Sequence, residues 1–130
     1  MKQGVPFATD RQITFYRPSE RTSPPQLEMM RIGGIELDPA RRRVRKNGRL
    51  VHLTPTEFEL AKHLMSQAGR PIRHSRLLAA VWGTGYGPTP EYLRTYMCQL
   101  RKKLEDDPQN PQYFLTQSHF GYYFTEELDR

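Results

Sequence analysis

The side chains best suited to contact a ligand lie on one short stretch of the sequence, residues 89–104. Hydrogen-bond donors and one methyl-bearing side chain recur there at helical spacing, and they include Arg94, Thr95, Cys98, Gln99, Arg101 and Lys102. Donors and methyl groups on one side of a helix can read base edges in the major groove of DNA. The chemistry that this stretch offers is recognition by hydrogen bonds and charge.

The same stretch has the features of a complete helix. Thr89 offers a side-chain oxygen at the N-cap, and Pro90 fits the first helical position, where a missing N–H costs nothing. Apolar residues recur at spacings of four, three and four, which places them on one side: Leu93, Met97, Leu100 and Leu104. The pattern is also typical of an ordinary amphipathic surface helix, which the stripe alone favours. The rest of the chain has to decide.

The composition favours an anionic partner. The 130 residues carry a formal net charge of +6 and a pI near 9.7, which favours nucleic acid and, to a lesser degree, an anionic membrane surface. A charge of this size is also normal for a soluble small domain. The single cysteine, Cys98, excludes an internal disulfide framework and fits a reducing compartment. No apolar run has the length of a signal peptide core or a membrane span, so we expect a soluble, cytoplasmic protein.

The first 28 residues are predicted to be a flexible tail or linker. They mix charge, serine and proline, and Pro24 and Pro25 prevent a helix from continuing through them. A short strand at residues 13–16 that docks on the body is the alternative. One domain is expected over residues 29–127, followed by a short polar end at 128–130.

Short strands are predicted to open this domain. Residues 30–32 and 35–37 are expected to pair across a glycine turn, and residues 41–54 to form a hairpin around Asn47-Gly48, the dipeptide favoured by type I′ turns. The expected apolar contacts of the hairpin are Val44, Leu50 and Leu53, and its basic residues are Arg41, Arg42, Arg43, Arg45, Lys46 and Arg49. These charges are suited to phosphate contacts, and slightly better suited to an edge hairpin that charge protects from aggregation.

A first helix is predicted to follow the hairpin. Residues 54–57, Thr-Pro-Thr-Glu, form a capping box with proline at the first helical position. The helix is expected to end near residue 68, with Gly69 as its left-handed cap. Its expected core residues are Phe58, Leu60, Ala61, Leu64 and Met65.

A second, shorter helix is predicted over residues 76–82, capped by His74 or Ser75 and ended by Gly83. Its expected core residues are Leu77, Leu78, Val81 and Trp82. A glycine-containing connector joins it to the basic helix, and residues 113–117 and 122–125 are expected to form a hairpin after that helix. Two helices, the second basic, and then a hairpin are the order of elements in a winged helix-turn-helix.

With these elements in place, the sequence resembles the DNA-binding effector domain of the OmpR/PhoB family of bacterial response regulators. The resemblance is carried by LTPTEFELAKHLMSQAGRPIRHSRLLAAVWG at 53–83, YLRTYMCQLRKKLEDDP at 92–108 and GYYF at 121–124. The pattern YLR-x-YM-x-x-LR-x-KL is most similar to the KdpE branch. The resemblance implies an α+β winged helix-turn-helix fold, with a short N-terminal antiparallel sheet, a three-helix core and a C-terminal hairpin as the wing.

The resemblance also implies a function, which is sequence-specific binding of double-stranded DNA by a transcriptional regulator of a two-component phosphorelay system. Helix 89–105 would enter the major groove, and hairpin 112–125 would act as a wing over the minor groove. The base-reading residues would be Arg94, Thr95, Cys98 and Gln99. The DNA-backbone residues would be Thr56, His74, Tyr96, Arg101 and Lys102. The wing contacts would be His119 and Tyr123, while Trp82 is expected in the core.

The family also implies partners. The loop 83–89, with Thr84 and Tyr86, would face RNA polymerase. Because family members bind tandem repeat sites as dimers, a lone effector domain is expected to be a monomer in solution that pairs on DNA.

Two departures from the family pattern bear on this interpretation. The wing has Ser118 and His119 where the family usually has arginine and glycine, and Tyr123 where an arginine usually enters the minor groove. We therefore expect a weakened or altered wing contact. The tail also lacks the length and the acidic cluster of a phosphoacceptor receiver domain.

The sequence also bears on two other classes of protein, an enzyme and a protein-binding module. An enzyme is disfavoured, because Pro88 stands where a Gly-x-Gly-x-x-Gly loop needs its third glycine. Cys98 has no patterned histidine partner, and the four histidines lack metal-ligand spacing, so we expect no catalytic residue, no metal and no cofactor. A winged helix adapted to bind protein, with weak or non-specific DNA binding, is the stronger alternative, and the atypical wing supports it. The basic helix argues against it.

Overall fold

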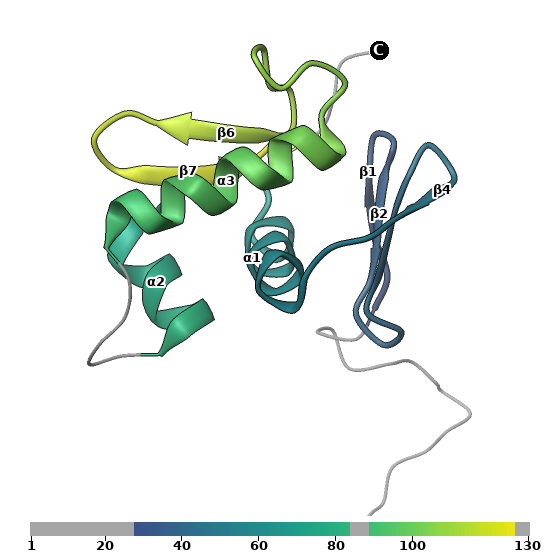
Figure 1. Ribbon diagram of the computed structural model, residues 1–130, viewed down its shortest axis with the longest axis horizontal. Coiled ribbons are helices and arrows are strands. Elements are labelled where there is room, and N and C mark those ends of the chain that lie inside the picture. Colours follow the sequence, from purple (N-terminus) through teal and green to yellow (C-terminus); the bar gives the residue numbers. More distant parts are fainter. Residues whose placement is uncertain (1–27, 84–88, 127–130) are drawn as a thin grey trace, which may run out of the picture.

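The computed structural model describes residues 28–83 and 89–126. Its elements follow in the order β1 (Met30–Ile32), β2 (Ile35–Asp38), β3 (Arg43–Lys46), β4 (Arg49–Val51), α1 (Pro55–Ser66), β5 (Ile72–Arg73), α2 (His74–Trp82), α3 (Pro90–Leu104), β6 (Phe114–Gln117) and β7 (Gly121–Phe124). Figure 1 shows α1 at the centre, between the N-terminal sheet and α2, with α3 and the β6–β7 hairpin above them. The predicted α+β winged helix is confirmed. The predicted tail up to residue 27, including the alternative strand at 13–16, and the end at 128–130 lie outside the described residues.

The N-terminal sheet is an antiparallel meander of four strands in the order β1-β2-β3-β4. Asn47 and Gly48 have φ values of 52° and 84°, the two positive values that a type I′ turn requires, so the predicted turn is confirmed. The expectation that Leu50 supplies an apolar contact was wrong, because its side chain is 60% exposed. Leu50 pairs with Arg45 on the outer face, whereas the next residue, Val51, pairs with the buried Val44.

Helix α1 begins with the predicted capping box. The Glu57 amide donates to Thr54 Oγ1 at 3.2 Å, and the Thr54 amide donates back to Glu57 Oε1 at 2.9 Å. The helix ends at Ser66 with Gln67 as its C-cap, so the assignment of the cap to Gly69 was wrong. Gly69 is left-handed, as predicted, but its amide donates to the Phe124 carbonyl at 2.8 Å and so connects the end of α1 to β7.

Helix α2 starts two residues earlier than predicted, and its N-cap is Arg73 rather than His74 or Ser75. The reason is tertiary, because β5 pairs with β7 and the His74 amide donates to the Phe120 carbonyl at 3.2 Å. Of the four apolar residues expected in the core, Leu77 is fully buried and Leu78, Val81 and Trp82 are half-buried against it. Gly83, with φ 94°, is the C-cap, as predicted.

Helix α3 buries the whole predicted stripe, and all four side chains have no exposed surface: Leu93, Met97, Leu100 and Leu104. Thr89 occupies the N-cap position, but its side chain makes no capping hydrogen bond. Hydrogen bonds from the Glu91 amide and from Thr89 instead lower the pKa of the Glu91 carboxyl. A carboxylate in the first turn thus takes the place of the predicted cap.

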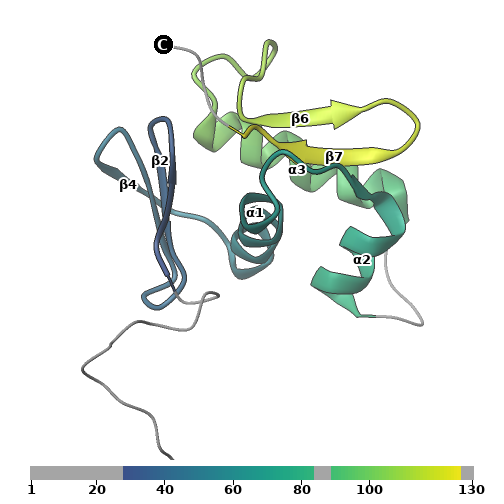
Figure 2. The ribbon, with the colours of Figure 1, turned by 180° about the vertical axis from the view of Figure 1, so that it is seen from behind.

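The second sheet, β5-β7-β6, carries the C-terminal hairpin. Residue 121 must be glycine, because a Cβ there would overlap the carbonyl oxygen of Ile72 on the neighbouring strand. Phe114 and Phe124 turn inward from the hairpin, fully buried and edge to face with centroids 5.0 Å apart. Figure 2 shows the hairpin running alongside α3. In the described ranges, 28–83 and 89–126, no helix has both the length and the hydropathy to cross a membrane.

Candidate nucleic-acid interface

Helix α3 presents the four predicted base-reading residues on the side opposite its buried stripe. Arg94, Thr95 and Cys98 are exposed, and Gln99 is half-buried. Arg94 and Cys98 are four residues apart, as are Thr95 and Gln99, so the four side chains form one compact patch over a turn and a half. The Thr95 hydroxyl donates to the Glu91 carbonyl at 3.2 Å, which leaves its methyl group as the part it offers a ligand.

The cations of α3 fall into two classes. In the part of the chain that the structure describes, Arg94 and Lys102 have no ion-pair partner, whereas Lys103 Nζ lies 2.6 Å from Oε1 of the buried Glu57. Lys103 is therefore used to neutralise a buried carboxylate. Arg94 and Lys102 keep their charge for an external anion.

Arg101 has a role that the sequence did not reveal. Its Nε donates to the Phe114 carbonyl at 2.9 Å, and Nη2 donates to Thr116 Oγ1 at 3.0 Å. The guanidinium also lies 5.9 Å from the centroid of the Tyr122 ring. Arg101 thus joins α3 to strand β6, which positions the hairpin beside the helix.

The other predicted DNA-backbone residues lie around the ends of helices. Thr56 is half-buried in the first turn of α1, and His74 is the first residue of α2, edge-on to Tyr122 with centroids 5.5 Å apart. Tyr96 is half-buried and packs 5.2 Å from Trp82, which lies against the core as expected. Tyr92, which the periodicity did not single out, joins this aromatic cluster and is 49% exposed.

The hairpin places the two predicted wing residues differently. His119 is exposed in the β6–β7 turn with φ 60°, and Tyr123 is half-buried on β7, where it pairs with Leu115. Because side chains alternate along a strand, the tyrosine that faces α3 is its neighbour Tyr122. Burial raises the pKa of Tyr122, while Arg101 and Arg94 oppose that rise. The phenol is therefore a neutral hydrogen-bond donor at neutral pH.

A buried carboxylate fixes the hairpin after α3. Glu105 is 7% exposed, and its two oxygens accept the amides of Gln112, Tyr113 and Phe114 at 2.7, 2.9 and 2.7 Å. The hydroxyl of Tyr113 in turn accepts the Gly34 amide at 2.9 Å, which connects the hairpin to the N-terminal sheet. The one weak sign of this anchor in the sequence is a glutamate directly after the helix.

Two further expectations concern the loop that would face RNA polymerase and the binding of metal. Thr84 and Tyr86, expected to face RNA polymerase, lie outside the described residues. Across residues 28–83 and 89–126, no three His, Cys, Asp or Glu side chains form a group that could hold a metal ion.

Known proteins are similar to this chain in sequence and in fold. Residues 48–124 match the family described as "Transcriptional regulatory protein, C terminal". The chain is 39% identical over 123 residues to the transcriptional regulatory protein KdpE of Mycobacterium tuberculosis, covering 92% of this chain and 54% of that protein. It therefore spans about half the length of this relative.

Solved structures agree. The response regulator DrrB of Thermotoga maritima, an OmpR/PhoB homologue, superposes with a TM-score of 0.70 at 31% identity, over 75% of this chain and 44% of DrrB. The RstA DNA-binding domain of Klebsiella pneumoniae, solved in complex with the RstA box, gives a TM-score of 0.69 at 28% identity, over 75% of this chain and 97% of that domain. These relatives are transcription factors and not enzymes. The chain belongs to the OmpR/PhoB family, and the part described here is the DNA-binding effector domain of a response-regulator transcription factor.

Proposed function

We propose that this chain binds double-stranded DNA sequence-specifically, with α3 in the major groove and the β6–β7 hairpin as a wing over the minor groove. The observation that carries the proposal is the patch of Arg94, Thr95, Cys98 and Gln99, displayed on α3 opposite a fully buried stripe. The RstA domain, which has the same fold, is bound to its DNA box, and this supports the assignment.

Each residue of the patch has a distinct role in this proposal. Arg94 donates two hydrogen bonds to guanine O6 and N7, Gln99 pairs with adenine, and the Thr95 methyl packs on a thymine methyl. Cys98 completes the surface that faces the bases. Each good bidentate pair supplies about 1–3 kcal/mol of discrimination against the wrong base.

The proposed backbone contacts set the register of the protein on DNA. Lys102 and Tyr96 contact phosphates from α3, and Thr56 and His74 do so from the first turns of α1 and α2, where the positive end of the helix dipole favours phosphate. Arg101 already donates from Nε and from Nη2 to β6, so a phosphate is left the two N–H groups of Nη1 and the second N–H of Nη2. His119 and Tyr123 give the wing a weaker minor-groove contact than the arginine usual in the family.

The proposal extends to the partners. The chain acts in the cytoplasm as a transcriptional regulator, is a monomer in solution and pairs on tandem repeat sites. The loop that contains Thr84 and Tyr86 contacts RNA polymerase. Light scattering with and without a duplex tests the oligomeric state, and a dimer without DNA would contradict it.

The test is selection from a pool of random-sequence duplexes at low and moderate salt. We expect salt-sensitive retention that enriches a repeated motif. Arg94→Ala should relax preference at one base position, and Lys102→Ala should weaken all sequences alike and lower the salt slope by about 1. Lys62→Ala, a lysine of α1 paired with Glu59, is the matched control and should change neither quantity.

Two results would reject parts of this proposal. An unchanged motif in a double substitution of Arg94 and Gln99 would remove base reading from this face of α3. Absence of retention at low salt would favour the alternative, a winged helix adapted to bind protein.

A further inference from the structure

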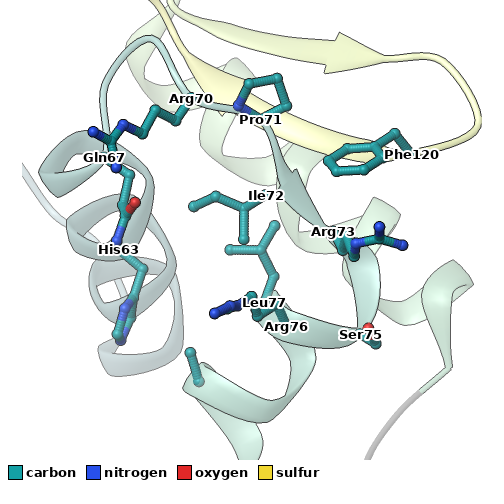
Figure 3. A pocket seen from close by; sticks show the side chains of 11 residues that line it. His63, Gln67, Arg70, Pro71, Ile72, Arg73, Ser75, Arg76, Leu77 and Phe120 are labelled. Atoms are coloured by element: carbon teal, nitrogen blue, oxygen red, sulfur yellow. The ribbon is translucent and has the colours of Figure 1, made fainter.

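A second surface, separate from the patch on α3, combines a pocket with several charged side chains. A pocket of about 560 Å³ lies between α1, β5 and the start of α2, and Phe120 from the hairpin turn closes one side (Figure 3). In Figure 2, α1 and α2 lie in front of α3, and Figure 3 looks into the pocket from that same side. The outer face of α3 and the pocket therefore open on different sides of the domain.

The rim of the pocket is cationic and lacks a counter-charge. Arg70, Arg73 and Arg76 are exposed and line it, and no aspartate or glutamate does. Within the described parts of the chain, none of the three arginines has an ion-pair partner. Figure 3 shows Arg70 and Arg76 extending toward α1, while Arg73 lies 4.9 Å from the ring centroid of Phe120. Two guanidinium groups that extend over one hollow, with a third at its edge, favour an anionic occupant.

The floor of the pocket is apolar. Ile72 and Phe120 are half-buried and supply its accessible apolar surface, whereas Leu77 is fully buried. An occupant that satisfied only the arginines would leave this floor against water, so the best fit has an apolar side chain between its acidic groups. The phosphate backbone of a duplex offers the charge but no apolar side chain. His63 lies on the α1 wall of the pocket, and its Nε2 atom is 3.9 Å from Oε1 of Glu59. Burial of the imidazole lowers the pKa of His63.

We propose that this pocket docks an acidic segment of a partner protein, with carboxylates on Arg70 and Arg76 and an apolar side chain on Ile72 and Phe120. The argument is charge complementarity over an apolar floor, and it uses no residue of the patch on α3. The docked segment would leave the patch on α3 accessible, so one chain could hold DNA and partner together.

The experiment uses the ¹⁵N-labelled full chain and a capped peptide, Asp-Glu-Leu-Glu-Asp. We expect amide shifts confined to residues 63–77 and 120, and at least tenfold weaker binding by the Arg70→Gln, Arg76→Gln double variant. The uncharged peptide Asn-Gln-Leu-Gln-Asn, and the peptide with serine in place of leucine, should both bind more weakly. Arg31→Gln is the matched control, because this arginine pairs with Glu36 on the N-terminal sheet, away from the pocket, and should not alter peptide binding.

Three outcomes would overturn the proposal. They are equal binding by the double variant with an intact melting transition, peptide shifts that map to α3, and displacement of the bound peptide by a short duplex. Retained selection of DNA by the double variant would show that the loss of peptide binding is separate from the proposed DNA-binding function.

Discussion

Replacing Glu105 by glutamine is expected to destabilise the domain by about 2–3 kcal/mol. The carboxylate accepts three backbone amides that begin strand β6, and both of its oxygens are used. A glutamine offers one acceptor oxygen and turns an NH2 group toward the remaining amides. At least one buried N–H then loses its acceptor, at about 1–3 kcal/mol, and the surviving bonds lose their charge assistance.

Glu105→Ala is expected to cost more, because it leaves all three amides without this acceptor. For a domain of this size, 1 kcal/mol shifts the melting temperature by roughly 4–8 °C. The glutamine variant should therefore melt roughly 10–20 °C below the parent chain. Glu126→Gln, an exposed carboxylate near the end of the hairpin, is the control and should stay within about 0.5 kcal/mol.

Urea denaturation of the three variants, together with amide hydrogen exchange, measures this effect. The amides of Gln112, Tyr113 and Phe114 should exchange faster in Glu105→Gln than in the control. A loss below about 1 kcal/mol, in the range of an ordinary solvent-exposed hydrogen bond, would refute the reasoning that the buried carboxylate anchors the hairpin.

Other substitutions and pH test separate parts of the fold. Gly121→Ala should cost about 3 kcal/mol or more, because its Cβ would displace the Ile72 carbonyl, and a melting temperature unchanged from the parent would contradict this. Thr54→Ala should cost about 1 kcal/mol in urea denaturation through loss of the capping box with Glu57, whereas an exposed serine changed to alanine should not. Because burial lowers the pKa of His63, the unfolded chain binds its proton more readily. The loss of unfolding free energy caused by His63 should be absent above pH 6.5 and should grow as the pH falls from 6.5 toward the pKa of His63 in the folded chain. The His63→Gln variant should lack this part of the pH dependence.

Local signals in the sequence predicted the elements well, because each depends on a few neighbouring residues. Asn47-Gly48 needs only its own backbone preference, and the stripe on α3 needs only helical spacing. The start of α2 was predicted wrongly because a strand pairing, β5 with β7, decides it from a distance.

The same distinction separates the parts of the candidate site. Periodicity alone predicts which face of α3 is exposed, and the resemblance to the OmpR/PhoB family selects the four residues of the patch on that face. The hydrogen bonds of Arg101 to β6 connect residues far enough apart in the chain that no spacing rule predicts them. The choice between Tyr122 and Tyr123 likewise depends on which face of the hairpin meets α3, and that is set by tertiary packing.

The two hydrogen bonds between Arg101 and β6 hold helix α3 and the hairpin together as one rigid unit. The span of this unit, which is the distance between the helix and the hairpin, is therefore fixed. The entropy cost of ordering the helix and the hairpin relative to each other is incurred when the chain folds, and not when it binds DNA. Any mismatch between that span and the distance from major to minor groove must then be taken up by the duplex. Sites that deform easily would be selected even at base pairs that no side chain touches.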